Sequence, residues 1–250
     1  MTRPSPRHTV PDMRAQFAKV GGAVQRNWRP DRLPHHVLLG LSGAGKSHMI
    51  RYGILPQAGP LAAVVVIDVK PGGDAAAWDG WGNDVPSARE LPCPLTLGPD
   101  KSCRWRIVHP GGLTAADVGR VLEQLGTEAA VILVMDDASS IIESGGQRGG
   151  MGLSGPVDTM LRQGRTHDLT LILGLNSTAW AGGAKNLAGT TWLGYTGNAD
   201  MRAEFAKVAG LPPAIRPALD GLLPKEWLYS AVDETAGLHV YAITRAPAAS

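Results

Sequence analysis

The chain has 250 residues, of which 44% are apolar and 18% charged, so it can bury a sizeable core and wholesale disorder is excluded. Its net charge of only +2 excludes a uniformly basic protein of histone type. Its longest apolar runs fall well short of the roughly 20 residues that a membrane-spanning helix needs, and the N-terminus lacks the apolar core of a secretory signal.

The charge is distributed unevenly. Residues 1–33 hold seven basic and two acidic residues, a net charge of +5, whereas the remainder carries a net charge of −3. This predicts a basic N-terminal arm over 1–33 and one domain over 34–250. The arm either contacts a polyanion or is a solvated, partly disordered tail. The two cysteines, Cys93 and Cys103, lack the C-x-x-C spacing of a zinc site and indicate a reduced, cytoplasmic protein.

Strands and helices are predicted to alternate along the domain. Apolar runs predict strands at 37–39, 61–68, 104–110, 129–137, 169–176 and 190–196, and a closing hairpin at 226–232 and 237–244. Helices are predicted at 45–52, 113–126 (with Thr114 as N-cap), 156–166 and 198–209, and a glycine-rich loop at 144–155. Strands separated by helices predict an α/β fold, with a mainly parallel sheet covered by helices on both faces.

The clearest motif is a phosphate loop, GLSGAGKS, over residues 40–47. Its glycines let the backbone N–H groups turn toward phosphate oxygens, and the following helix adds its positive N-terminal end. Lys46 can reach the β- and γ-phosphates of ATP, and the hydroxyl of Ser47 can bind Mg²⁺. The predicted nucleotide-binding residues are therefore Gly40, Leu41, Ser42, Gly43, Ala44, Gly45, Lys46, Ser47 and His48.

A second motif, VILVMDD, ends a buried strand in two acids. Beside a phosphate loop, Asp136 would hold Mg²⁺ and Asp137 would polarise the attacking water. The alternative is an acidic strand end that caps the next helix.

A third motif, LRQGRTHDLTLILGLNSTAW, places an arginine before a buried strand and an amide at its end. With these residues the chain resembles the FtsK/HerA superfamily of DNA-pumping ATPases, especially the motor domains of type IV coupling proteins and the packaging ATPases of small phages. The resemblance implies a RecA-like fold. It also implies that Asn176 senses the γ-phosphate and that Arg165 is an arginine finger supplied to a neighbouring subunit.

The likeness covers about residues 34–245. It includes an acid and a lysine after the second strand, Asp68 and Lys70. It also includes the order of elements over 190–244, which is a strand, a helix that begins at NADMRAEFAKVAG, the segment LLPKEWLY and a last strand. The chain departs from the family in having Asp137 where Glu is usual and Asn176 where Gln is usual. The shorter side chain of Asp137 would have to approach the water more closely or act through a second water. If Asp137 is not the catalytic base, Glu143 is the next candidate. The residues of the chain predict no membrane anchor, helical domain or winged helix of the kind found in larger members, so a minimal motor is expected.

What the resemblance implies is ATP hydrolysis coupled to movement of double-stranded DNA by a ring, expected to be a hexamer. Arg148 and Lys185 are candidates for gripping DNA phosphates. A phage packaging motor is an alternative within the same class, and a small-molecule kinase or a nucleotide switch is an alternative outside it.

Other residues are open to two interpretations. Trp78 and Trp81 either stack on a base or anchor a loop on the core. The pair His35 and His36 has no partner pattern for a metal site, and His167 is either a surface residue or close to a subunit interface.

Overall fold

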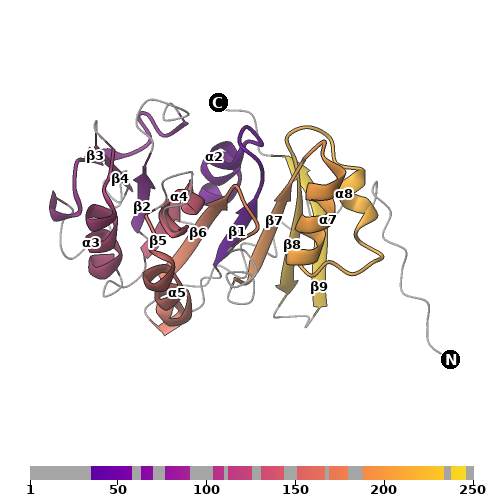
Figure 1. Cartoon of the computed structure of the whole chain (residues 1–250). Coiled ribbons are helices and arrows are strands. Elements are labelled where there is room, and N and C mark those ends of the chain that lie inside the picture. Colours follow the sequence, from indigo (N-terminus) through magenta and orange to yellow (C-terminus); the bar gives the residue numbers. More distant parts are fainter. Residues whose placement is uncertain are drawn as a thin grey trace.

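The sheet is the frame of the molecule and sets where the site lies. The computed structural model describes residues 35–57, 63–69, 77–90, 104–109, 112–125, 131–143, 151–166, 169–179, 188–233 and 238–245. Within them, nine strands form one sheet in the order β3-β4-β2-β5-β6-β1-β7-β8-β9 (Figure 1). Strands β1 to β7 run parallel, whereas β8 and β9 are antiparallel to their neighbours.

The element bounds are as follows. The strands are β1 His36–Leu39, β2 Ala63–Asp68, β3 Asn83–Val85, β4 Arg104–Val108, β5 Val131–Met135, β6 Leu169–Leu175, β7 Thr190–Gly194, β8 Glu226–Asp233 and β9 Leu238–Arg245. The α-helices are α2 Lys46–His48, α3 Ala115–Leu125, α4 Ala138–Ile142, α5 Ser154–Gln163, α7 Ala199–Val208 and α8 Pro217–Asp220. The π-helix η1 spans Met49–Ile54, and the 3₁₀ turns are η2 Leu55–Gln57, η4 Ala88–Glu90 and η6 Gly164–Thr166.

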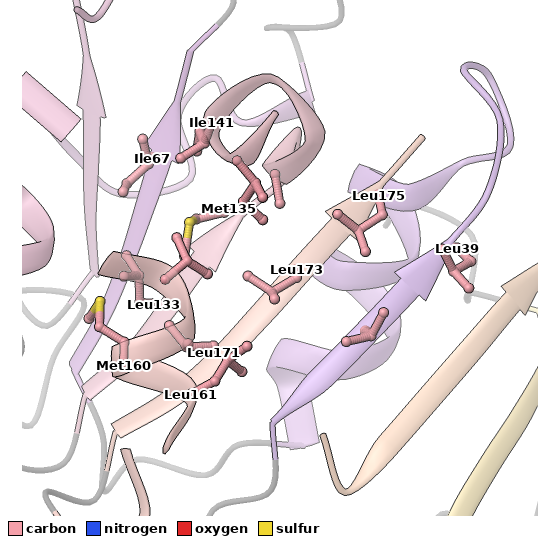
Figure 2. Packing of buried hydrophobic residues seen from close by; sticks show 14 of the residues in the cluster. Leu39, Ile67, Leu133, Met135, Ile141, Met160, Leu161, Leu171, Leu173 and Leu175 are labelled. Carbon is pink, nitrogen blue, oxygen red and sulfur yellow. The ribbon is translucent and has the colours of Figure 1, made fainter. Parts of the chain in front are cut away.

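Alternate side chains of the strands pack into two buried layers, one on each face of the sheet. One layer lies under α3, α4, α5, α7 and α8, and Figure 2 shows part of it, including Leu133 and Met135 from β5 and Leu171 and Leu173 from β6. The other layer lies under η1 and includes Ile132 and Val134. Because β5 and β6 are covered on both faces, their sequences are continuously apolar.

The structure confirms the mainly parallel α/β sheet, the six parallel strands predicted from apolar runs and the closing hairpin. The helix after the phosphate loop is longer than predicted. It continues past Tyr52 as η1 and η2, because Ile54 and Leu55 extend its buried face. The strand β3 and the short helices α4 and α8 were not predicted, since three to five residues are too few to show a period.

Several predictions fall outside the described residues. The basic arm over 1–33, most of the glycine-rich segment, and Lys70, Cys93, Cys103, Arg148, His167 and Lys185 all lie there. The division into an arm and a domain therefore stays a prediction. In the described part of the chain, no helix combines the length and apolar character needed to cross a membrane.

Candidate active site

Three motifs that are far apart in the sequence meet at one edge of the sheet. The phosphate loop follows β1, the two acids follow β5, and Asn176 follows β6, which lies between those strands. Since the strands are parallel, their carboxyl ends share an edge. The N–H of Gly40 donates to the carbonyl oxygen of Leu175 at 3.1 Å, which joins the start of the loop to the end of β6.

The glycines of the phosphate loop have different structural roles. Gly43 and Gly45 have φ angles of 80° and 87°, a left-handed conformation that other residues adopt at a cost. Gly40 is required by space instead. A Cβ there would lie 3.1 Å from Cη2 of the buried Trp227 on β8. The loop therefore rests on an indole that comes from nearly 190 residues further along the chain.

Lys46 is bonded inside this edge. Its ammonium donates to the carbonyl oxygens of Gly40 at 2.8 Å and Leu41 at 3.1 Å, and also to Oδ1 of Asn176. The Nδ2 of Asn176 in turn donates to Oδ1 of Asp137 at 2.8 Å. An ammonium can only donate and a carboxylate can only accept, so the two neighbours fix the orientation of the amide. A continuous chain of hydrogen bonds links Lys46 to Asp137.

Two serines that follow the acids complete this chain. Ser139 Oγ accepts from the backbone N–H of Asn176 at 2.9 Å, and Ser140 Oγ donates to Oδ2 of Asp137 at 2.6 Å. Ser177, the residue after Asn176, donates a hydrogen bond from its hydroxyl to Oε1 of Glu143. The sequence analysis missed both serines, although their position in the first turn after the two acids is a usable signal.

Asp136 is held differently from Asp137. Its Oδ2 accepts a hydrogen bond from Nε1 of Trp78 at 2.8 Å, whereas its buried Oδ1 has no partner within the described part of the chain. Burial raises the pKa of Asp136, and hydrogen bonding from Ser47 and Trp78 and the charge of Lys46 oppose that rise. The carboxyl group thus has one oxygen fixed and one available.

These groups fit Mg²⁺. The available Oδ1 of Asp136 and the hydroxyl of Ser47 are both oxygen ligands, which Mg²⁺ prefers. Among the described residues, no three His, Cys, Asp or Glu side chains gather into a metal cluster. A cation here would therefore rest on few protein ligands, as Mg²⁺ does when phosphate oxygens and water supply the others.

A glycine on β6 allows the acids to lie this close to Asn176. A Cβ on Gly174 would lie 2.2 Å from the carbonyl oxygen of Asp136, so any larger residue would push the turn after β5 away. Periodicity could not reveal this glycine, because the contact is between strands.

Asp68 is engaged in a buried ion pair. Oδ2 of Asp68 accepts from Nε and Nη2 of Arg106 at 3.1 and 2.9 Å, and both side chains are less than a tenth exposed. Arg106 also contacts Asp79 at 2.8 Å. The structure therefore places Asp68 in an anchor between β2 and β4.

Arg165 lies at the opposite edge of the sheet. It belongs to η6, four residues before the start of β6, whereas Asn176 follows the end of that strand. At about 3.3 Å per residue the strand alone spans about 20 Å. The backbone of Arg165 is therefore separated from its own phosphate loop by the length of β6. Its role in a neighbouring site stays a prediction.

Two interpretations of other residues are settled. Trp78 and Trp81 are 1% and 7% exposed, so the base-stacking interpretation is wrong and the loop-anchoring one is confirmed.

The two neighbouring histidines are also buried: His36 is the first residue of β1, and His35 directly precedes it. The Nδ1 of His35 accepts from the N–H of Leu171 at 3.0 Å, so its Nε2 carries the proton and donates to the carbonyl oxygen of Leu161 at 3.0 Å.

The chain is similar to known proteins in structure, but no similarity in sequence was found. No protein-family model matches the sequence, and no curated protein does. The genome packaging NTPase B204 from Sulfolobus turreted icosahedral virus 2, solved with ATP-gammaS, superposes with a TM-score of 0.60 at 14% identity. The match covers 88% of this chain and 100% of B204.

Two further solved structures are similar. VirB4 of Thermoanaerobacter pseudethanolicus matches with a TM-score of 0.58 at 11% identity, over 89% of this chain and 92% of VirB4. The pCW3 conjugation coupling protein TcpA matches with a TM-score of 0.51 at 16% identity, over 86% of this chain and 61% of TcpA. The chain shares the fold of these ATPases, a RecA-like α/β fold with a mainly parallel sheet. A packaging ATPase and a coupling protein are the two kinds of protein that the sequence resembles, and the fold agrees with that resemblance.

Proposed function

We propose that this chain is an ATP-hydrolysing motor of FtsK/HerA type that moves double-stranded DNA. The observation that carries the proposal is the hydrogen-bonded chain from Lys46 through Asn176 to Asp137, with Asp136 and Ser47 beside it. It joins a group that binds phosphate, an amide at the end of the middle strand and a carboxylate that can act on water.

Each residue then has a task in hydrolysis. The loop Gly40–His48 binds the triphosphate of ATP, and Ser47 and Asp136 hold Mg²⁺, which when bound neutralises charge on the β- and γ-phosphate oxygens. Lys46 leaves Asn176 for the phosphates, because a phosphate anion is a stronger acceptor than an amide. Asn176, still bonded to Asp137, is then free to contact the γ-phosphate while Asp137 orients the attacking water.

The proposal extends to DNA and to a ring. Two of the similar structures are a genome packaging NTPase and a conjugation coupling protein, and this supports a role in handling DNA. Arg165 lies at the edge of the sheet away from its own phosphate loop, which favours a task in the neighbouring subunit of a ring, a hexamer by the resemblance. The cytoplasmic location is likewise a prediction.

A phage or viral packaging motor is the second candidate within this class. Its support is the similarity in structure to B204, which is a genome packaging NTPase.

ATPase activity measured with and without double-stranded DNA tests the proposal. A motor is stimulated by DNA, a kinase by a small acceptor, and a switch by neither. Lys46→Ala should abolish turnover without unfolding the chain, because Lys46 binds phosphate rather than filling the core. Hydrolysis at the wild-type rate by Lys46→Ala would disprove the phosphate-loop assignment.

The ring is tested by mixing variants. Arg165→Ala should bind ATP normally but lose about 10³–10⁵-fold in turnover, the range for arginine fingers. Combined with Lys46→Ala protein, it should regain part of the activity, because some interfaces then pair an intact loop with an intact arginine. Full activity of Arg165→Ala alone would remove the argument for a ring.

A further inference from the structure

We propose that Trp78 is a positioning residue for the metal site: its indole N–H holds one oxygen of Asp136 so that the other oxygen is presented to Mg²⁺. The inference rests on the proposed function, because it concerns the same site. It starts from the asymmetry of the Asp136 carboxylate, whose Oδ2 accepts from Trp78 at 2.8 Å while its buried Oδ1 has no partner within the described residues.

A carboxylate on a short side chain can rotate about its last bond, and one fixed oxygen removes that freedom. Hydrogen-bond partners behind a metal ligand commonly have this orienting task. Trp78 is suited to it, because its side chain is 1% exposed and lies in the layer of core residues under η1. The indole is therefore held by packing, and its only donor faces the acid.

The turn that carries Trp78 is itself anchored. The backbone N–H of Trp81 donates to the carbonyl oxygen of Trp78 at 3.1 Å, and the two indoles meet edge to face with centroids 5.3 Å apart. Arg106, which binds Asp68 at the end of β2, also binds Asp79 in this turn at 2.8 Å. The turn is thus fixed to the sheet on the side of β2 and β4.

A second arginine fixes the turn to the helix that follows the phosphate loop. Nη1 of Arg51 donates to the carbonyl oxygen of Ala77. Arg51 belongs to η1, which continues the helix that begins with Lys46 and Ser47. One turn therefore touches both halves of the proposed metal site: it binds Asp136 through Trp78 and the helix of Ser47 through Arg51.

The test compares Trp78→Phe with Trp81→Phe. Both changes remove the N–H of a buried indole in the same turn, but of the two only Trp78 donates to Asp136. The probes are Mn²⁺, observed by EPR in the presence of AMP-PNP, and a fluorescent derivative of AMP-PNP titrated in EDTA and in Mg²⁺. Circular dichroism and thermal unfolding show whether each variant folds.

Trp78→Phe should weaken Mn²⁺ binding about 10–100-fold, the range for the loss of a partner behind a metal ligand. Its affinity for the nucleotide in EDTA should equal that of the wild type, and Trp81→Phe should match the wild type in both measurements. Equal losses in the two variants, or a loss in EDTA as well, would overturn the inference and leave Trp78 as a packing residue. A wild type that binds no nucleotide even with Mg²⁺ would instead overturn the proposed function.

An experiment without a Trp78 variant covers the case in which Trp78→Phe does not fold. The seven tryptophans give seven indole N–H signals in a ¹⁵N-labelled protein. The signal that changes most in Asp136→Asn should be the one that changes most when Mg²⁺ and AMP-PNP are added to the wild type. Different signals in the two spectra would contradict a link between the indole and the metal ligand.

Discussion

Asp68 is the last residue of β2, and Asp136 directly follows the neighbouring strand β5. The two acids lie at the same level of the sheet, since Ile67 of β2 pairs with Met135 of β5, yet their surroundings differ. Asp68 accepts two hydrogen bonds from the buried Arg106, so its charge is compensated within the chain. Asp136 has no cation bonded to it in this way: its Oδ2 accepts from Trp78, and its buried Oδ1 has no partner in the described residues. A buried carboxylate that is paired with an arginine of the same chain stabilises the fold. A buried carboxylate with an oxygen that accepts no hydrogen bond is suited to binding a metal cation.

Removing the charge of Asp136 gives the largest expected effect. Asp136→Asn should lower Mg²⁺-dependent ATP turnover on the order of 10²–10³-fold, because the amide is a poor ligand for Mg²⁺. Its stability in urea should stay within about 1 kcal/mol of the wild type, since burial already disfavours the charged form. Wild-type turnover by this variant would place the metal ligand elsewhere.

Removing the cation beside Asp68 should instead lower the stability of the fold. Arg106→Met leaves a buried carboxylate uncompensated and should lower the free energy of unfolding by about 3–5 kcal/mol. Urea denaturation measures this loss. The double variant Arg106→Met/Asp68→Leu serves as control and should recover part of it. No loss in the single variant would remove the contrast between the two acids.

His36 extends the comparison to a buried group that stays uncharged. Burial, together with the charge of His35, lowers the pKa of His36 to about 3 from its usual 6.5. Below pH 6.5 the unfolded chain takes up a proton that the folded chain does not, so stability falls as the pH drops from 6.5 toward 3.

The slope for one such group is at most about 1.4 kcal/mol per pH unit, so the loss between pH 7 and pH 5 should be about 2 kcal/mol. Urea denaturation at both pH values measures it. In His36→Asn, which cannot titrate but keeps an acceptor for the indole N–H of Trp192, this part of the pH dependence should vanish. An unchanged slope would show that other groups cause it.

The smallest effect is expected at a helix end away from the phosphate loop. Oγ1 of Thr114 accepts from the N–H of Asp117 at 3.2 Å, and the Asp117 carboxylate accepts from the N–H of Thr114 at 3.1 Å. Thr114→Ala should lower stability by about 1 kcal/mol. Thermal unfolding measures this change, and Mg²⁺-dependent turnover should not change. A change in turnover would mean that stability alone alters activity, and the Asp136 result would need correction for it.

The parts of the fold that follow from local patterns could be predicted from the sequence. The strands β5 and β6 have unbroken apolar runs because both faces are buried, and the N-cap of α3 shows in Thr114 and the apolar period after it. The phosphate loop is contiguous, so its residues and their order are visible directly.

The sequence does not reveal contacts between distant residues. Trp78 and Asp136 are 58 residues apart, and nothing near either residue announces that an indole donates to that acid. Gly174 is similar, since its need for a bare Cα depends on the turn after another strand. The π-helix after the loop is also invisible, because residues 49–54 fit an ordinary helical pattern equally well.

The position of β6 has a mechanical consequence. This seven-residue strand carries Asn176 at one end and follows Arg165 at the other, and it is bonded along its length to β5 and β1. Close-packed interiors transmit displacement with little compression. If Arg165 enters the neighbouring site as proposed, β6 is a rigid connection in each subunit between two nucleotides: Asn176 after its end contacts one, and Arg165 before its start contacts the next. A displacement at one end of β6 would then reach the other end. The sites around the ring would therefore hydrolyse ATP in sequence rather than independently.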